Sequence, residues 1–320
     1  MGGQLYVSEA VEAACGPQLD RVGPGMPRFV ARAGGPDPDF ASIEALYFSG
    51  DVFPHRSREF AVVALKAENL RWLHTFSAGV DDRFFRMLLE RGVKLSTSSG
   101  VHAVPIAHTV ALYLLALTRD LPGWLSDQAA HRWNPRDVRD LQGLHLGVLG
   151  MGPIGVETAK LGQALGMRVT GVRRAPQGDE PCETLPLADL DELLPRLDAV
   201  VVALPLAEAT RGLIDARRLS LMKPGALFVN VGRGPIVDEP ALVEALGSGH
   251  LGGAGLDVFA EEPLPGSSPL WELPNVIITP HSSGDTPGNH DRANEIFVEN
   301  LGRFSKGERL RNEVEAAGAT

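Results

Sequence analysis

The chain has 320 residues, more than one hydrophobic core usually holds, so its length predicts two domains. Its 30 basic and 40 acidic side chains give a net charge of −10, which is the wrong sign for a surface that binds nucleic acid or anionic lipid. The two cysteines and the lack of Cys/His clusters argue against a disulfide framework and a metal site. No segment reads as a signal peptide or approaches the ~18 apolar residues of a membrane span, so we expect a cytoplasmic protein.

Short apolar runs alternate with helical patterns from the start of the chain to about residue 99. The runs are QLYVS, MPRFVAR, EALYFSG, WLHTFSAG and VKLSTSS. The patterns REFAVVALKAENL and DRFFRMLLERG lie between the later runs and have apolar residues at helical spacing. Strands separated by helices predict a parallel sheet with helices on its faces, and therefore a small α/β domain.

The most apolar helical region covers residues 104–133 and is interrupted at Pro122 and Gly123. A helix that is apolar on nearly all sides must be buried, either in a core or against another subunit. We favour a subunit interface, and so the sequence predicts a homodimer.

The segment LHLGVLGMGPIG, residues 144–155, reads as an apolar strand, a glycine turn and the start of a helix. Gly150, Gly152 and Gly155 have the spacing G-x-G-x-x-G, the fingerprint of a dinucleotide site. The first glycine permits a tight turn, the second lets backbone N–H groups approach a pyrophosphate, and the third lets the helix pack on the strand. Because the chain has 36 glycines, a structural turn could match by chance, but the flanking strand and helix favour the nucleotide site.

Strands and helices alternate again after the glycine turn. Six strands are expected in this part: LHLGVLG, MRVTGV, DAVVVALP, GALFVNVG, GGAGLDV and NVIITP. Six is the number in a complete dinucleotide-binding sheet. The end of the chain holds one long amphipathic helix, and since no strand remains to extend this sheet, we expect the helix to return to the first domain.

Four blocks of sequence carry a family resemblance. In chain order they are FSAGVDD, LQGLHLGVLGMGPIG, ATRGLIDARRLSLMKPGALFVNVGRGPIVDEPALVEAL and AGLDVFAEEPLPGSSPLWELPNVIITPHSSG. Together they resemble the D-isomer-specific 2-hydroxyacid dehydrogenases. The resemblance implies an α/β protein of two Rossmann-like, doubly wound parallel-sheet domains, the first flavodoxin-like and discontinuous. Residues 1–98 with 286–320 would bind the substrate, and residues 99–285 would bind the dinucleotide.

Three side chains at predicted strand ends match catalytic residues of that family. Arg233, in VGRGPIVDE, has a guanidinium that can hold a carboxylate through paired hydrogen bonds and polarise the adjacent carbonyl. His281, in TPHSSG, can move a proton near neutral pH, which suits the proton donor to a carbonyl oxygen during hydride delivery. Glu262, rather than Glu261, matches the carboxylate that the family places beside this histidine, where its charge favours the protonated ring.

The resemblance also implies binding residues outside this trio. Ser77, Ala78 and Gly79 match a loop whose backbone N–H groups bind the substrate carboxylate, although a turn that caps the next helix fits as well. Asp257 matches a contact to the nicotinamide carboxamide, with a strand-end aspartate that caps a turn as the alternative. The remaining cofactor contacts that the resemblance implies are Met151, Pro153, Ile154, Leu204, Pro205, Val231, Gly232, Arg233 and His281.

The residues after the strand MRVTGV distinguish two cofactors. A dinucleotide fold normally supplies an Asp or Glu there, about 20 residues after the glycines, to bind the ribose 2′-OH. Here Arg173 and Arg174 follow the strand, and no acid occurs before Asp179. A guanidinium can pair with a 2′-phosphate, so the sequence predicts NADP(H) in preference to NAD(H). The alternative is that both arginines are exposed without a ligand.

These residues together predict an oxidoreductase that transfers a hydride between NADP(H) and a small 2-keto or D-2-hydroxy acid, similar to the glyoxylate and hydroxypyruvate reductases. We expect this acid as the partner, and neither nucleic acid nor a membrane. A nucleotide-sensing binding protein, similar to the corepressor branch of the family, is the alternative because that branch keeps the catalytic trio. His108 in PIAHTV and Ala207 in LAEAT depart from the family pattern and leave local packing and cofactor contacts open.

Overall fold

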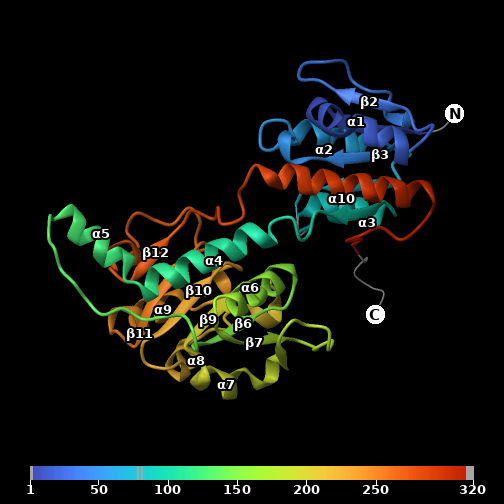
Figure 1. The fold of residues 1–320 in the computed structure, drawn as a ribbon. Coiled ribbons are helices and arrows are strands. Elements are labelled where there is room, and N and C mark those ends of the chain that lie inside the picture. The colour runs from blue at the N-terminus through green and yellow to red at the C-terminus, as the bar shows by residue number, and fades with distance from the viewer. Residues whose placement is uncertain (1–2, 78, 81, 315–320) are drawn as a thin grey trace. The chain divides into compact units, whose positions relative to one another are not determined.

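The computed structural model describes residues 3–77, 79–80 and 82–314. The chain divides into two compact units, each with its own sheet covered by helices (Figure 1). Unit 1 runs to Val101 and resumes at Thr286, and unit 2 comprises His102–Asp285. The chain therefore passes from one unit to the other at two points.

Unit 1 contains a parallel sheet in the order β2-β1-β3-β4-β5, the strand order of flavodoxin-like folds. Its strands are β1 (Gln4–Ser8), β2 (Arg28–Ala31), β3 (Ile43–Phe48), β4 (Trp72–Thr75) and β5 (Lys94–Thr97). Its helices are α1 (Glu9–Val22), α2 (Ser57–Lys66), α3 (Arg83–Glu90) and α10 (Gly288–Ser305). Each strand expected in this part of the chain is present.

The C-terminal helix α10 packs on unit 1. Phe297 is fully buried and stacks on Tyr47, with ring centroids 4.1 Å apart, and on Trp72, 5.6 Å away. Leu301 lies in the same apolar cluster as Leu5. Figure 1 shows α10, in red, against the blue and teal elements of this unit. The two ends of the chain therefore build one core.

Unit 2 contains a second parallel sheet, in the order β12-β11-β10-β9-β6-β7-β8. Its strands are β6 (His145–Leu149), β7 (Arg168–Arg173), β8 (Glu183–Pro186), β9 (Ala199–Val202), β10 (Ala226–Asn230), β11 (Leu251–Leu256) and β12 (Val276–Ile278). Its helices are α4 (Ala103–Thr118), α5 (Leu121–Ala129), α6 (Pro153–Ala164), α7 (Leu190–Leu193), α8 (Ala216–Leu221) and α9 (Glu239–Gly247). The strand order reverses between β6 and β9, the point at which open parallel sheets bind ligands.

The predicted fold class, two doubly wound parallel-sheet domains, is confirmed, and two elements differ from expectation. β8 adds a seventh strand to the expected six. Its sequence ETLP is polar and partly exposed at the sheet edge, so it has no apolar run to reveal it. The pattern LADLDELLPRL predicts one helix, but the structure has the short α7 between two 3-10 turns, Leu187–Asp189 and Leu194–Arg196, and Pro195 in the second turn lacks the N–H for a further α-helical hydrogen bond.

The break in the apolar helical region lies at Arg119 and Asp120, not at Pro122 and Gly123. Asp120 has a φ of 51°, and its carboxylate accepts a hydrogen bond from the Gly123 N–H at 3.2 Å. Pro122 lies in the first turn of α5, where its missing N–H costs nothing. The proline therefore begins the second helix instead of ending the first.

Helix α4 is partly buried and partly exposed. Tyr113 and Leu114 lie in the core of unit 2, whereas Leu112 and Leu115 are 55% and 41% exposed.

In the described part of the chain no single helix is long and apolar enough to cross a membrane, and only the bent pair of α4 and α5 passes that test by length and composition.

Candidate active site

The glycine turn that follows β6 has the shape of a dinucleotide cradle. Gly150 has a φ of 105°, and a Cβ on it would lie 2.7 Å from the carbonyl oxygen of Ala203. A Cβ on Gly155 would lie 1.8 Å from the carbonyl oxygen of Gly150. Gly152 instead faces open space, and α6 begins directly after it without a side-chain cap. The uncapped backbone N–H groups of α6 therefore suit the pyrophosphate of a dinucleotide.

The other predicted cofactor positions lie around this turn. Met151 is buried beneath it, Pro153 and Ile154 open α6, Leu204 and Pro205 follow β9, and Val231 and Gly232 follow β10. β6 and β10 both pair with β9, so the carboxyl ends of these three strands meet at one edge of the sheet. The site thus combines three neighbouring loops, as a cofactor that crosses the sheet requires.

The two arginines after β7 differ in their surroundings. Nη1 of Arg173 donates to Glu180 Oε1 at 2.9 Å and to Gln177 Oε1 at 3.0 Å. Glu180 accepts hydrogen bonds from the backbone N–H groups of Gln177 and Gly178 and from the Arg173 side chain. These donors lower the pKa of its carboxyl to about 2. Arg174 is exposed, and within the described residues its side chain forms no hydrogen bond or ion pair. Arg174 is therefore the arginine whose charge is available to a phosphate.

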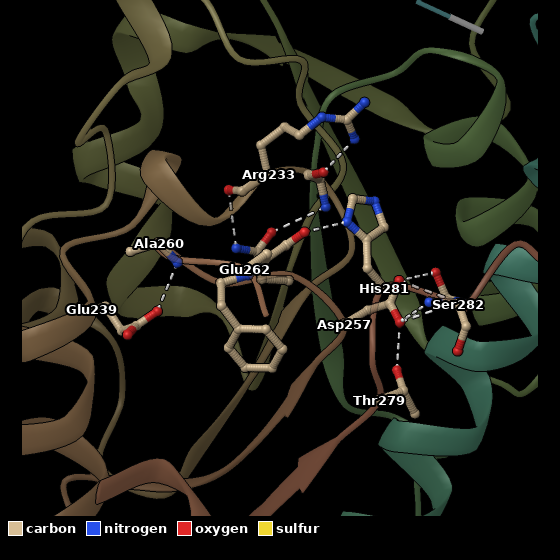
Figure 2. Close-up of polar contacts among 12 residues, drawn as sticks. Arg233, Glu239, Asp257, Ala260, Glu262, Thr279, His281 and Ser282 are labelled. Carbon is tan, nitrogen blue, oxygen red and sulfur yellow. Dashed lines mark hydrogen bonds and ion pairs between the residues drawn. The ribbon is translucent and has the colours of Figure 1, made fainter. Parts of the chain in front are cut away.

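Arg233, Glu262 and His281 lie in the loops after β10, β11 and β12, where Figure 2 shows them together. Nδ1 of His281 is 2.7 Å from Oε2 of Glu262, and the other carboxylate oxygen accepts from the Phe259 N–H at 3.0 Å. A carboxylate on Nδ1 stabilises the protonated ring and leaves Nε2–H to donate. Glu261 is exposed, so Glu262 is the residue that the structure brings to the histidine.

The Arg233 side chain has unused hydrogen-bonding capacity. Its Nη1 donates to the Gly232 carbonyl at 2.7 Å, and within the described residues the guanidinium has no other partner. Asn230 shapes the turn that carries it, since its amide oxygen accepts from the Gly232 N–H at 3.0 Å and its amide nitrogen donates to the Arg233 carbonyl at 3.2 Å. The remaining guanidinium donors can bind a carboxylate in paired geometry.

Asp257 is buried and caps the turn that contains His281. Its carboxylate accepts from Thr279 Oγ1, from the backbone N–H groups of Ser282 and Ser283, and from Ser283 Oγ (Figure 2). Four donors fill the usual capacity of a carboxylate. The structure therefore gives Asp257 the turn-capping role, and its contact to the nicotinamide carboxamide stays a prediction.

The predicted carboxylate-binding loop lies in unit 1, after β4. The Ser77 N–H bonds to Thr75 Oγ1 at 3.2 Å, Gly79 follows in a coil, and Ala78 lies outside the described residues. Helix α3 is capped by Asp82, whose carboxylate accepts from the Phe84 N–H at 2.7 Å. The cap is thus a separate residue, so Ser77 and Gly79 are not needed for it.

Sequence reasoning missed the residues that support the trio. Glu239, in the first turn of α9, accepts from the Ala260 N–H at 2.9 Å and so holds the loop of Glu262. Thr279 and Ser283 bind Asp257, as described above. Short polar side chains in loops are too common to be singled out by type, and their role depends on neighbours far away in the sequence.

Comparison with known proteins assigns the family. The D-isomer specific 2-hydroxyacid dehydrogenase NAD binding domain matches residues 111–283, more than half of the chain. A glyoxylate reductase of Thermofilum pendens is 34% identical over 76% of this chain and 74% of its own length. A relative from Haemophilus influenzae is 38% identical over 60% of this chain and 64% of its own length.

A solved structure extends the similarity to nearly the whole chain. The D-isomer specific 2-hydroxyacid dehydrogenase of Xanthobacter autotrophicus, in complex with NADPH and MES, is 33% identical, covers 98% of both chains and has a TM-score of 0.78. The glycine cradle, the strand-end trio and these similarities agree. This chain belongs to the D-isomer specific 2-hydroxyacid dehydrogenase family.

Proposed function

We propose that this chain is an NADPH-dependent reductase that converts a small 2-keto acid, of the size of glyoxylate or hydroxypyruvate, into a D-2-hydroxy acid. The observation that carries the proposal is the 2.7 Å contact between His281 and Glu262 at a strand end, beside an arginine with unused donors. The Thermofilum relative is named a glyoxylate reductase, which supports this substrate class.

Each residue of the trio has a distinct task in this reaction. A nicotinamide dinucleotide held at the glycine turn supplies the hydride that adds to C2. Arg233 binds the substrate carboxylate and orients the C2 carbonyl. His281 gives its Nε2 proton to the carbonyl oxygen as negative charge develops there, and Glu262 stabilises the protonated ring before the transfer. The product is the hydroxy acid.

We assign substrate binding to unit 1 as well. The backbone N–H groups around Ser77 and Gly79 would bind a substrate carboxylate, and the residues of this unit would then select the substituent on C2. The support is the match of FSAGVD to the family loop and the fact that α3 is capped without these residues.

The preference for NADPH rests on Arg174. This arginine is exposed at the end of β7, whereas the charge of Arg173 is already paired with Glu180. A 2′-phosphate would gain charge-assisted hydrogen bonds from Arg174, and Glu180, the acid at this strand end, is already paired with Arg173. The Xanthobacter structure, which contains NADPH, supports this cofactor.

The cofactor proposal is tested by kcat/KM with NADPH and NADH on one keto acid. We expect wild type to prefer NADPH and Arg174→Asp to lose about 10- to 100-fold with NADPH, since a hydrogen bond to a charged group contributes about 1.5–3 kcal/mol. The value with NADH should change little. Arg168→Asp makes the same charge change at the other end of β7 and should leave the preference intact.

Two results would contradict these proposals. A wild-type preference for NADH refutes the choice of NADPH. Cofactor binding without turnover of any acid in a panel of 2-keto acids refutes the reductase and favours the nucleotide-sensing alternative.

We also propose that the protein is a homodimer joined through α4 and α5. Leu112 and Leu125 are each 55% exposed and Trp133 is 96% exposed, which is costly for an isolated subunit. A second copy of the chain would cover these side chains.

A further inference from the structure

Helix α4 holds the turn that carries His281 through polar side chains on one of its faces. Thr109 Oγ1 donates to the Ser283 carbonyl at 3.1 Å, and His102 Nδ1 lies 3.3 Å from the Gly284 carbonyl oxygen. One turn further along the helix, the Tyr113 hydroxyl contacts Thr279 Oγ1. Residues 102, 109 and 113 repeat at helical spacing, so they share one face.

The direction of the hydrogen bonds at Thr279 follows from its chemistry. The Asp257 carboxylate can only accept, so the single hydroxyl proton of Thr279 goes to Asp257 Oδ1, at 2.5 Å. Tyr113 must then donate to Thr279. Burial raises the pKa of Tyr113 to about 12, which keeps its phenol protonated as this direction requires. The bonds form a chain from Tyr113 through Thr279 to Asp257.

The chain of hydrogen bonds ends on the backbone that directly follows His281. Asp257 accepts the His281 N–H on its main-chain oxygen at 2.8 Å, while its carboxylate accepts the N–H groups of Ser282 and Ser283. His281 has a φ of 52°, a left-handed conformation that persists only where the surroundings enforce it. The Asp257 carboxylate therefore holds the backbone of the two residues that directly follow the histidine, and through them it constrains the turn that carries the imidazole.

We propose that Tyr113 is a positioning residue for His281. Tyr113 fixes the Thr279 hydroxyl and, through it, the Asp257 carboxylate. In this way it determines where the imidazole lies against Glu262. The proposal rests on the proposed function, in which His281 is the proton donor. Tyr113 touches neither the histidine nor Glu262, and its aromatic ring packs against Gly255 of β11.

The charged groups around His281 determine what loosening the turn would do. Glu262 favours the protonated ring, Asp257 lies beneath the turn, and Arg233 and Glu239 lie in the neighbouring loops (Figure 2). His102 faces the turn from α4. Of these, only Glu262 bonds to the ring, so a looser turn weakens this contact first.

The test replaces Tyr113 by Phe, which keeps the ring and removes the hydroxyl. We expect kcat for keto acid reduction to fall by about tenfold and the KM for NADPH to stay unchanged. This loss in kcat is smaller than the roughly 10²-fold that a 1 Å misplacement can cost. Thr118→Val is the matched control, because it also removes a buried hydroxyl from α4, one that bonds only within the helix.

A second readout does not depend on turnover. In protein with ¹⁵N-labelled histidine, assigned with His281→Gln, the NMR signal of the Nδ1–H proton that bonds to Glu262 should move upfield in Tyr113→Phe and stay in place in Thr118→Val. If the two variants behave alike in both measurements, Tyr113 has only a packing role and the proposal is wrong. If this signal moves but wild type reduces no keto acid, the positioning role stands and the proposed function fails.

Discussion

His281 shows how much local structure one catalytic side chain requires. Its left-handed backbone, at a φ of 52°, costs about 1–3 kcal/mol in a residue other than glycine. The cost is offset by hydrogen bonds to Asp257 from the histidine and from the two serines that follow it. In return, the ring is held 2.7 Å from Glu262, and the free nitrogen is presented to the substrate.

Replacing His281 by Ala should abolish turnover and leave cofactor binding nearly intact. Loss of one general acid usually costs about 10²–10⁴ in rate, and the glycine turn does not involve this side chain. The measurements are kcat with a 2-keto acid and NADPH binding by fluorescence. His108→Ala, which removes an exposed histidine from α4, should change neither. A His281→Ala protein with near-normal kcat would exclude this residue from the mechanism.

His74 in unit 1 differs from His281, because its ring is buried and has no part in the proposed reaction. It is fully buried between Ser96 Oγ, 2.8 Å from Nδ1, and Ser98 Oγ, 3.1 Å from Nε2, and burial lowers its pKa to about 3. The folded state therefore keeps His74 neutral at a pH at which the unfolded chain binds a proton. Its contribution to stability is complete above pH 6.5, falls as the pH falls from there, and is lost by about pH 3.

This linkage predicts an acid sensitivity in unit 1. Between pH 7 and 5.5 the wild-type free energy of unfolding should drop by about 1 kcal/mol more than that of His74→Gln, whose amide cannot titrate. Urea unfolding at both pH values measures the difference. Equal drops in the two proteins would show that His74 is protonated in the folded state.

At the scale of elements, α10 connects the two ends of the chain. It begins after β12 of unit 2, yet its apolar face packs against α1 and the buried rings of unit 1. Asn300 also ties the helix to the segment beyond it, accepting from the Arg311 N–H at 2.7 Å and donating to the Arg311 carbonyl at 3.0 Å. Unit 1 therefore depends on two segments that lie on either side of unit 2 in the sequence.

Phe297→Ala should destabilise unit 1 by about 3–5 kcal/mol, the usual cost of truncating a buried phenylalanine. Trp72 is the one tryptophan of unit 1, so urea unfolding can be followed at this residue after the three in unit 2 are changed to Phe. Phe53→Ala, at a side chain that is 38% exposed, should cost much less. Similar losses in the two variants would contradict a core role for α10.

At the scale of the whole molecule, the exposed apolar side chains of α4 and α5 predict the assembly. Leu112→Glu combined with Leu115→Glu should convert a dimer into a monomer, because two charges cannot be buried unpaired in an apolar interface. Solution scattering at micromolar concentration gives the mass. Val62→Glu with Leu65→Glu on α2, an exposed pair at the same spacing, should leave the dimer intact. A monomeric wild-type protein would contradict the proposed homodimer.

Much of the architecture was predictable because it depends on local patterns. Apolar runs separated by amphipathic helices predict parallel sheets, and the glycine spacing marks the nucleotide turn at Gly150. The patterns failed where local signals were weak or misleading. β8 is a polar edge strand, and Pro122 begins a helix in a place where proline usually ends one. Family motifs, not physical pattern alone, pointed to Arg233, Glu262 and His281.

Most strands and helices, in their order along the chain, and the chemical types in the loops after the strands follow from the amino-acid sequence. The contact of Glu262 with His281, the pairing of Glu180 with Arg173 that leaves Arg174 exposed, and the bond of Tyr113 to Thr279, 166 positions away, emerge in the folded chain alone. The physical reason is that periodicity and propensity act between near neighbours. A hydrogen bond between distant residues exists only once packing has brought its donor and acceptor together.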